Sequence, residues 1–288
     1  MANQSLKALE IAFEKFVESY DANCVLSKAV SKETIDGKAA QRAGDVMYVR
    51  QNYEASTVTG LDVSGETDMD VVQRAVPIAF RDPENVIFNL DSKEARDEDV
   101  MRKQGEAAAK SLAAFVDQSL YNTAVGKAAN VVTSATAFDW DLGATVEEQM
   151  ILRGIQLSDA KLFMNAGDWR VIASELGQRQ YTSDRTQAAY ERSQVPDIAN
   201  LMTFRTDNIV NVAGAGTVAS TTINGAQSHT VTSKDANNVP VDNRQMALTV
   251  QGANVANIKA GDAFTIPGVN AVHMKTKSDT NVLQTFRI

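Results

Sequence analysis

The longest helical pattern in the chain covers residues 91–126, DSKEARDEDVMRKQGEAAAKSLAAFVDQSLYNTAVG. Asp91 is a good N-cap, and Glu94 three residues later completes a capping-box arrangement that satisfies free backbone donors. Gly126 is a suitable residue to end the helix. At 1.5 Å per residue, a helix over 92–125 is about 50 Å long, well above the usual helix length. We therefore predict a structural spine.

The two parts of this predicted spine differ in composition. Its first turns are almost wholly charged, whereas its later turns are rich in alanine and can pack closely against a neighbour. Apolar and small side chains follow one stripe along the helix, as expected for a helix with one buried face. The stripe consists of Met101, Ala108, Leu112, Phe115, Val116, Ser119 and Thr123.

An amphipathic helix is predicted ahead of the spine, over residues 4–21. Glu10, Glu14 and Glu18 step by four along one face. Two interpretations remain open: a surface helix packed on its own domain, or an arm whose apolar stripe and acidic ridge meet different partners. Large apolar residues recur at three- and four-residue steps, so they share another face. These residues are Leu6, Leu9, Phe13, Phe16, Val17 and Tyr20.

Extended chain is predicted over residues 45–80, where β-branched and apolar residues alternate with polar ones. Pro77 in the second half is compatible with an edge strand. The pattern predicts a long hairpin with little core beneath it. An isolated two-stranded ribbon is marginally stable in water and leaves its edges open. We therefore expect this ribbon to pack against another part of the assembly, such as another subunit.

Between Arg50 and Arg74 of this hairpin lie five acidic residues, and no basic residue separates them. The plain interpretation is a solvated loop. The alternative is a surface that docks onto basic groups of a neighbour. The five residues are Glu54, Asp62, Glu66, Asp68 and Asp70.

The rest of the chain changes character at about residue 209. Before it, residues 131–205 mix helix and strand: Thr145 is expected to cap a helix, 161–164 to form a strand, and Asp168 to start another helix. This alternation suits a small sheet with helices against it. After residue 209, helical periodicity disappears, and short β-like runs are separated by Gly, Asn and Asp turns. These runs predict an all-β barrel or sandwich module.

Composition and charge narrow the classes of function. The 288 residues carry 28 basic and 36 acidic side chains, so the net charge is −8 and the chain lacks the basic balance of a general nucleic-acid binder. No run of 18 apolar residues is present, which argues against a membrane-spanning helix. The first residues lack the apolar core of a secretion signal. A single cysteine, Cys24, excludes an internal disulfide and favours a reducing compartment.

Motifs that could carry enzyme chemistry are weak in this chain. Residues 214–219, GAGTVA, imitate a dinucleotide fingerprint, but β-branched residues follow them where a phosphate-binding helix is needed. His229 and His273 have no further ligand at zinc spacing. Cys24 is best interpreted as a small buried residue. Residues 97–99 are three adjacent acids that point in different directions around a helix. We therefore predict no enzyme activity, no cofactor and no metal site.

The order of these parts resembles that of the tailed-bacteriophage major capsid proteins with the Hong Kong 97-type fold. It is most similar to the coat proteins of short-tailed enterobacterial phages, which carry an inserted β-barrel domain. The resemblance covers nearly the whole chain, and its signal is the order of short matches. These matches are Phe88-Asn89-Leu90, Ala95-Arg96-Asp97-Glu98, Phe163-Met164-Asn165-Ala166-Gly167-Asp168-Trp169, Asn224-Gly225-Ala226-Gln227-Ser228, Val241-Asp242-Asn243-Arg244 and Lys259-Ala260-Gly261-Asp262.

The resemblance implies an α+β fold and a division of the chain into five parts. In the family the chain then returns to complete the axial and peripheral domains. Here it ends inside an expected strand, so either the chain continues or the final module is terminal. The five implied parts are an N-terminal arm (1–40), an extended loop (41–78), a peripheral domain with the spine helix (79–130), part of the axial domain (131–208) and an inserted β domain (209–288).

The resemblance also implies a function in the virion capsid. The chain is expected to self-assemble into pentamers and hexamers of an icosahedral shell in the host cytoplasm. Its expected partners are a scaffolding protein, a portal protein and packaged double-stranded DNA bound without sequence specificity, with no membrane. The acidic ridge Glu10, Glu14 and Glu18 suits the basic docking motif of a scaffold, and the acidic loop residues suit contacts with a neighbouring subunit.

Some relatives weld their shells through a lysine–asparagine bond. Between Lys38 and Lys93 this chain has no lysine, so its extended loop has no amine to donate.

The alternative function is a cell-surface or tail-associated binding module with a ligand-binding β domain. An oxidoreductase is the third possibility, and it rests on residues 214–219 alone.

Overall fold

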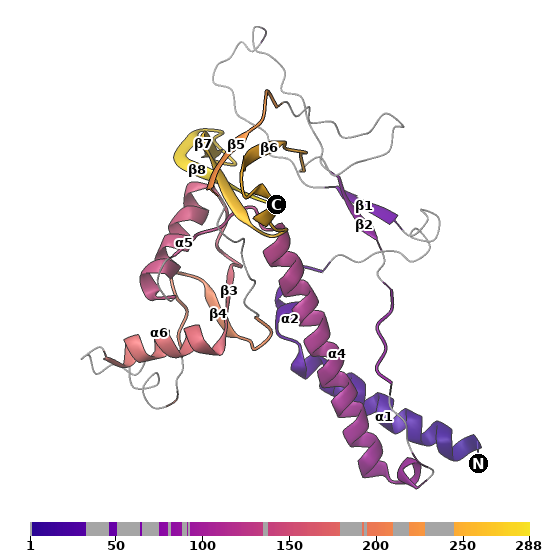
Figure 1. Ribbon diagram of the computed structural model, residues 1–288. Helices are drawn as coiled ribbons and strands as arrows, with labels where there is room; N and C mark the ends of the chain where they lie inside the picture. The colour runs from indigo at the N-terminus through magenta and orange to yellow at the C-terminus, as the bar shows by residue number, and fades with distance from the viewer. Residues whose placement is uncertain are drawn as a thin grey trace. The chain divides into compact units, whose positions relative to one another are not determined.

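A computed structural model shows an α+β chain that divides into two compact units (Figure 1). The first unit contains residues 1–31, 83–212 and 285–287, and the second contains 32–82, 213–284 and 288. The structure describes residues 2–32, 46–50, 64, 75–79, 82–87, 91, 93–134, 138–178, 192, 195–209, 219–227 and 245–288.

Helices form one part of the first unit. The arm helix α1 spans Ala2–Asn23, and the single turn α2 follows at Leu26–Ala29. A 3₁₀ turn, η1 (Glu94–Arg96), precedes the spine helix α4 (Glu98–Lys127). With 30 residues, α4 is about 45 Å long, which confirms the predicted spine. Figure 1 shows α1 lying along the first half of α4.

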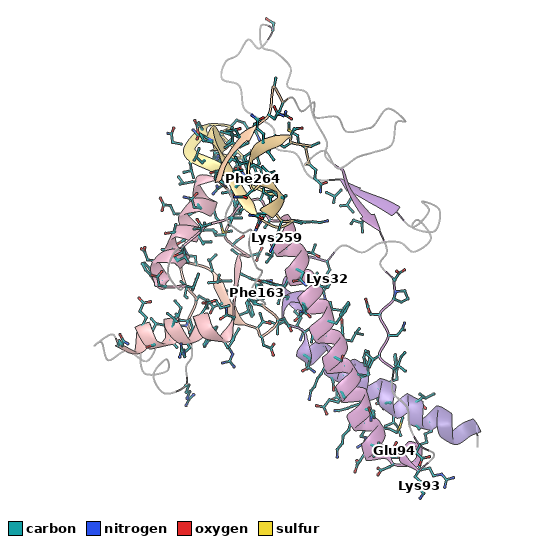
Figure 2. The ribbon with its side chains drawn as sticks, viewed as in Figure 1. Lys32, Lys93, Glu94, Phe163, Lys259 and Phe264 are labelled. Carbon is teal, nitrogen blue, oxygen red and sulfur yellow. The ribbon has the colours of Figure 1, made fainter. Side chains whose placement is uncertain are left out.

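The start of the spine differs from the prediction. Asp97 is the N-cap, because its backbone is extended and its carboxylate accepts the N–H of Asp99 at 3.0 Å. The predicted cap, Asp91, lies outside the helix. Its N–H still donates at 3.1 Å to the carboxylate of Glu94, which is labelled in Figure 2, and this is one of the two hydrogen bonds of a capping box. The predicted end of the helix also differs, because Gly126 lies inside α4, which ends at Lys127.

The arm and the spine approach each other through small residues. Ala8 and Ala12 of α1 are buried against Met101 of α4. A Cβ atom added to Gly105 would overlap the carbonyl oxygen of Ala12 and lie 3.1 Å from its carbonyl carbon. Gly105 therefore permits a close approach between two helix backbones. The buried positions of α4 are Met101, Gly105, Ala108, Ala109, Ala113 and Asp117.

A parallel strand pair and two helices form the rest of the first unit. Helix α5 (Trp140–Leu152) leads to β3 (Lys161–Met164), α6 (Ala166–Gln178) and β4 (Met202–Arg205). β3 and β4 are parallel, and the ring of Phe163, labelled in Figure 2, stacks with that of Phe204 at a centroid distance of 5.4 Å. The predicted strand at 161–164 is confirmed. The core here consists of Met164, Ile172, Ala173, Val195 and Ile198.

The cap of α5 is not the predicted one. Asp139 caps the helix, because its carboxylate accepts the N–H of Leu142 at 2.8 Å. Thr145 lies inside the helix, where its hydroxyl donates to the carbonyl of Asp141 at 3.0 Å. Ser and Thr often bond backwards in this way inside helices, which explains why Thr145 imitates a cap in the sequence.

The second unit, in the residues that the structure describes, is built of paired strands. β1 (Val46–Arg50) and β2 (Ala75–Ala79) are antiparallel, with Tyr48 opposite Pro77. This pairing confirms the two ends of the predicted hairpin.

The remaining strands also form pairs. β5 (Ala219–Ile223) pairs with β6 (Val250–Ala253), and after the 3₁₀ turn η2 (Val255–Asn257) comes the pair β7 (Ala263–Val272) and β8 (Asp279–Arg287). The described strands thus make separate two-stranded sheets, and the predicted barrel stays a prediction.

The packing of α1 on α4 makes Gly105→Ala destabilising. Alanine favours a helix over glycine by about 1 kcal/mol. The added methyl group at this position must push α1 away, which costs about 1–3 kcal/mol in packed sites. We expect a net loss, measured as a lower free energy of unfolding in urea by circular dichroism.

The matched control is Gly126→Ala in the same helix. No atom lies within 4 Å of the position that a Cβ would take at Gly126. This variant should therefore gain roughly 0.5–1 kcal/mol from helix propensity alone. Equal shifts for the two variants would contradict the close approach at Gly105.

Candidate assembly surface

The connection after α1 is tied to the spine by one carboxylate. Asp117 of α4 is fully buried, and its Oδ2 accepts the N–H groups of Val25 at 2.9 Å and Leu26 at 3.2 Å. Its Oδ1 accepts the N–H of Ser27 at 3.0 Å. α2 has no side-chain cap of its own at Val25. Asp117 therefore caps this turn from a helix 90 residues further along the chain.

Two other polar side chains gather at this connection. Burial raises the pKa of the Tyr20 phenol, and the nearby Cys24 thiol and Asp117 carboxylate raise it further. Cys24 is a free, buried thiol, in agreement with its interpretation as a small buried residue. The base of the arm is thus a partly polar cluster made by α1, α2 and α4.

Three of the large apolar residues of α1 share a face that the spine does not cover. Leu9, Phe13 and Val17 are 57%, 67% and 53% exposed, whereas Ala8 and Ala12 are buried against α4. The structure thus shows α1 packed on α4 of its own unit, with these three side chains uncovered, and the role of an arm that meets different partners stays a prediction. Our sequence reasoning missed the two alanines. Their four-residue spacing, which matches the small residues of α4, is the signal that indicates the packed face.

The acidic ridge lies beside this apolar stripe. Glu10, Glu14 and Glu18 each directly follow one of the three exposed apolar residues, so each lies about 100° further around the helix. All three are exposed. Glu18 pairs with Lys15 of the same helix at 2.7 Å. Glu10 and Glu14 form no ion pair with any residue that the structure describes.

These six residues make one surface, which we call the outward face of α1. It consists of Leu9, Phe13 and Val17 together with Glu10, Glu14 and Glu18. The face offers apolar area and negative charge side by side. Such a surface suits a partner that presents apolar and basic side chains together.

One comparison with known proteins identifies what this surface belongs to. The family described as "P22 coat protein - gene protein 5" matches the chain over residues 1–288. The chain belongs to this family. It is a major capsid protein of the short-tailed phage group and forms the shell of the virion. The resemblance inferred from the sequence is confirmed, and the alternative of a surface or tail-associated binding module is not favoured.

The coat-protein family also bears on catalysis. It is a family of structural proteins and not of enzymes. The described part of the coat protein contains no group of three metal-ligating side chains. None of its described helices is long and apolar enough to cross a bilayer. The residues after Ala219 form strand β5, where a dinucleotide site requires a helix.

The acidic loop residues and the two histidines differ in what the structure of the coat protein says about them. The acidic loop residues lie outside the described residues, as does His229, so their predicted roles stay predictions. His273 has a local role: its Nδ1 accepts the N–H of Thr276 at 3.1 Å in the turn between β7 and β8. The loop residues are Glu54, Asp62, Glu66, Asp68 and Asp70.

Because Phe13 is exposed on the subunit, its replacement should hardly affect subunit stability. We expect Phe13→Ser to lower the free energy of unfolding by less than about 1 kcal/mol, the size of a lost ring contact with Phe16. Met101 of α4 is buried against Ala8 and Ala12 of α1, so Met101→Ala leaves a cavity between the two helices and should cost about 2–5 kcal/mol. Urea unfolding of both variants measures this difference, and a similar loss in the two would place Phe13 in the core.

Proposed function

We propose that the coat protein assembles, on a scaffolding protein, into an icosahedral procapsid of pentamers and hexamers. The shell also holds a portal protein and encloses double-stranded DNA without reading its sequence, and it forms in the host cytoplasm. The outward face of α1 is the observation that carries this proposal, because it is an uncovered surface suited to a second protein.

The proposed arrangement within the subunit is that of the Hong Kong 97-type fold. The helix α4 serves as the spine of a peripheral domain, and its length suits a rod that resists deformation. The β1–β2 ribbon belongs to an extended loop that leans on a neighbour, since two strands alone are marginally stable. The proposed parts are the arm (1–40), the loop (41–78), the peripheral domain (79–130), part of the axial domain (131–208) and the inserted β domain (209–288).

The overall charge supports the role of a DNA container. The net charge of −8 is opposite to that of a general DNA binder. A strongly basic inner wall would hold the packaged polymer tightly, whereas an acidic subunit leaves it loosely bound. The DNA is therefore enclosed by the shell and not gripped by it.

The scaffold contact is placed on the acidic ridge. Glu10 and Glu14 are exposed and form no ion pair with described residues, so both remain available to a basic partner. The adjacent apolar stripe adds area that water leaves when a helix docks there. The charges set the orientation and rate of docking, because exposed charges steer encounter more than they add affinity.

Reversing the charge of the ridge tests this contact. The double variant Glu14→Lys, Glu18→Lys should bind scaffolding protein roughly tenfold more weakly at low salt. The difference should shrink as salt rises, because salt screens exposed charges. Sedimentation or light scattering of subunits titrated with scaffolding protein measures it.

The matched control is Glu148→Lys on the exposed side of α5. It makes the same kind of charge change on a helix outside the arm, so it should leave scaffold affinity close to wild type. If the ridge variant also binds as wild type across the salt series, the ridge is not the scaffold site.

The shell should be held together without covalent links. The segment between Lys38 and Lys93 contains no lysine, so the proposed loop has no amine for a lysine–asparagine bond. Intact particles boiled in SDS should release a single coat-protein band. A ladder of covalent multimers on the gel would contradict this prediction.

A further inference from the structure

The arm is held to the spine by contacts of two different kinds. Along its length, Ala8 and Ala12 pack on α4 near Gly105, which is close contact without hydrogen bonds between side chains. At its base, Asp117 receives three backbone N–H groups. The ion pair between Lys7 and Glu98 is long, at 3.8 Å, and exposed, so it contributes little.

The Asp117 contact fixes direction as well as position. Three consecutive amides converge on the two oxygens of one carboxylate, so this carboxylate determines how the chain turns between α1 and α2. Packing of the small residues, in contrast, fixes which face of α1 is buried but does not set the path of the chain after the helix. A buried carboxylate is costly unless it is fully hydrogen-bonded, so the three amides and Asp117 depend on one another.

Two other contacts of the capped turn reach elements other than the spine: Lys28 pairs with Asp21 of α1 at 3.2 Å, and Lys161 of β3 donates to the carbonyl of Ala29 at 2.9 Å. The Ser27 hydroxyl is buried and has no hydrogen-bond partner among the residues that the structure describes. The backbone N–H of the same residue is bonded to Asp117. The described hydrogen bonds between this turn and the spine therefore run through backbone amides and the Asp117 carboxylate.

We propose that Asp117 is the positioning residue of the arm: it pins the turn after α1 to the spine helix, and it thereby sets the direction in which the outward face of α1 is presented during assembly. This proposal rests on the assembly role proposed above for the arm. In this proposal, Asp117, a buried residue of α4, determines the orientation of the outward face of α1.

Two substitutions at Asp117 and one at Ser27 test the pin. Asp117→Ala removes both acceptor oxygens. Asp117→Asn keeps one acceptor oxygen and the shape, but turns an NH₂ group toward N–H donors. Ser27→Ala removes a hydroxyl without a partner in the described part of the chain and leaves all three bonds to Asp117 intact, so it is the matched control in the same turn.

Hydrogen exchange of the full-length subunit gives the first readout. The amides of Val25, Leu26 and Ser27 should exchange about tenfold faster or more in Asp117→Ala, and to an intermediate extent in Asp117→Asn. The amides of α1 should also lose protection, whereas those in the middle of α4 should not. Ser27→Ala should exchange as wild type. Unchanged protection of these amides in both Asp117 variants overturns the pin.

Scaffold-assisted assembly gives the second readout. Both Asp117 variants should form fewer closed shells and more aberrant particles by electron microscopy, with Asp117→Ala the more severe. If the amides are deprotected and normal shells still form, the role of Asp117 in assembly is overturned. The attachment of the turn by Asp117 is then still supported. Failure of the ridge variants to affect scaffold binding is a separate result and leaves the exchange readout unaffected. If Asp117→Ala does not fold, the near-isosteric Asp117→Asn carries both readouts.

Discussion

The close approach between Ala12 and Gly105 is the constraint on which the arm depends. Two helix backbones meet there, and no Cβ on Gly105 can be accommodated without moving α1. With Ala8 and Ala12 on the packed face, Leu9, Phe13 and Val17 are left exposed on a neighbouring face, about 100° further around the helix. The small residues therefore determine which surface of α1 is offered to a partner. In most proteins the large apolar residues would occupy the packed face.

Residues with a strong local pattern were predictable from the sequence. The existence of the spine, the strand at 161–164 and the paired ends of the hairpin follow from hydrophobic periodicity. The first residue of α4 was not predictable, because Asp91 and Asp97 are both good caps. Only the structure shows that the carboxylate of Asp97 accepts a free N–H at the start of the helix. For α1, the sequence indicates two faces but not which one is buried. The usual assumption that large apolar residues lie inside fails for a subunit that assembles.

The role of Asp117 had no local signal at all. Its partners are 90 to 92 residues earlier in the chain, and they are backbone amides, which every residue has. The one hint in the sequence is an acidic residue in the alanine-rich half of the spine. The ridge glutamates, in contrast, were visible at once because their four-residue spacing is itself the signal. Contacts between distant segments are the part of this subunit that one sequence does not reveal.

The exit of the spine helix has a consequence for the order of folding. The Thr285 hydroxyl donates to the carbonyl of Ala129 at 2.5 Å and accepts the N–H of Val131 at 3.1 Å, and Arg287 donates to the carbonyl of Ala128 at 3.1 Å. These partners are 154 to 159 residues apart. On the ribosome, the segment after α4 emerges long before the strand that holds it is made, so it waits unpaired through the synthesis of everything between. Closing so long a loop is slow, which makes the end of the spine one of the last places in the nascent chain to settle.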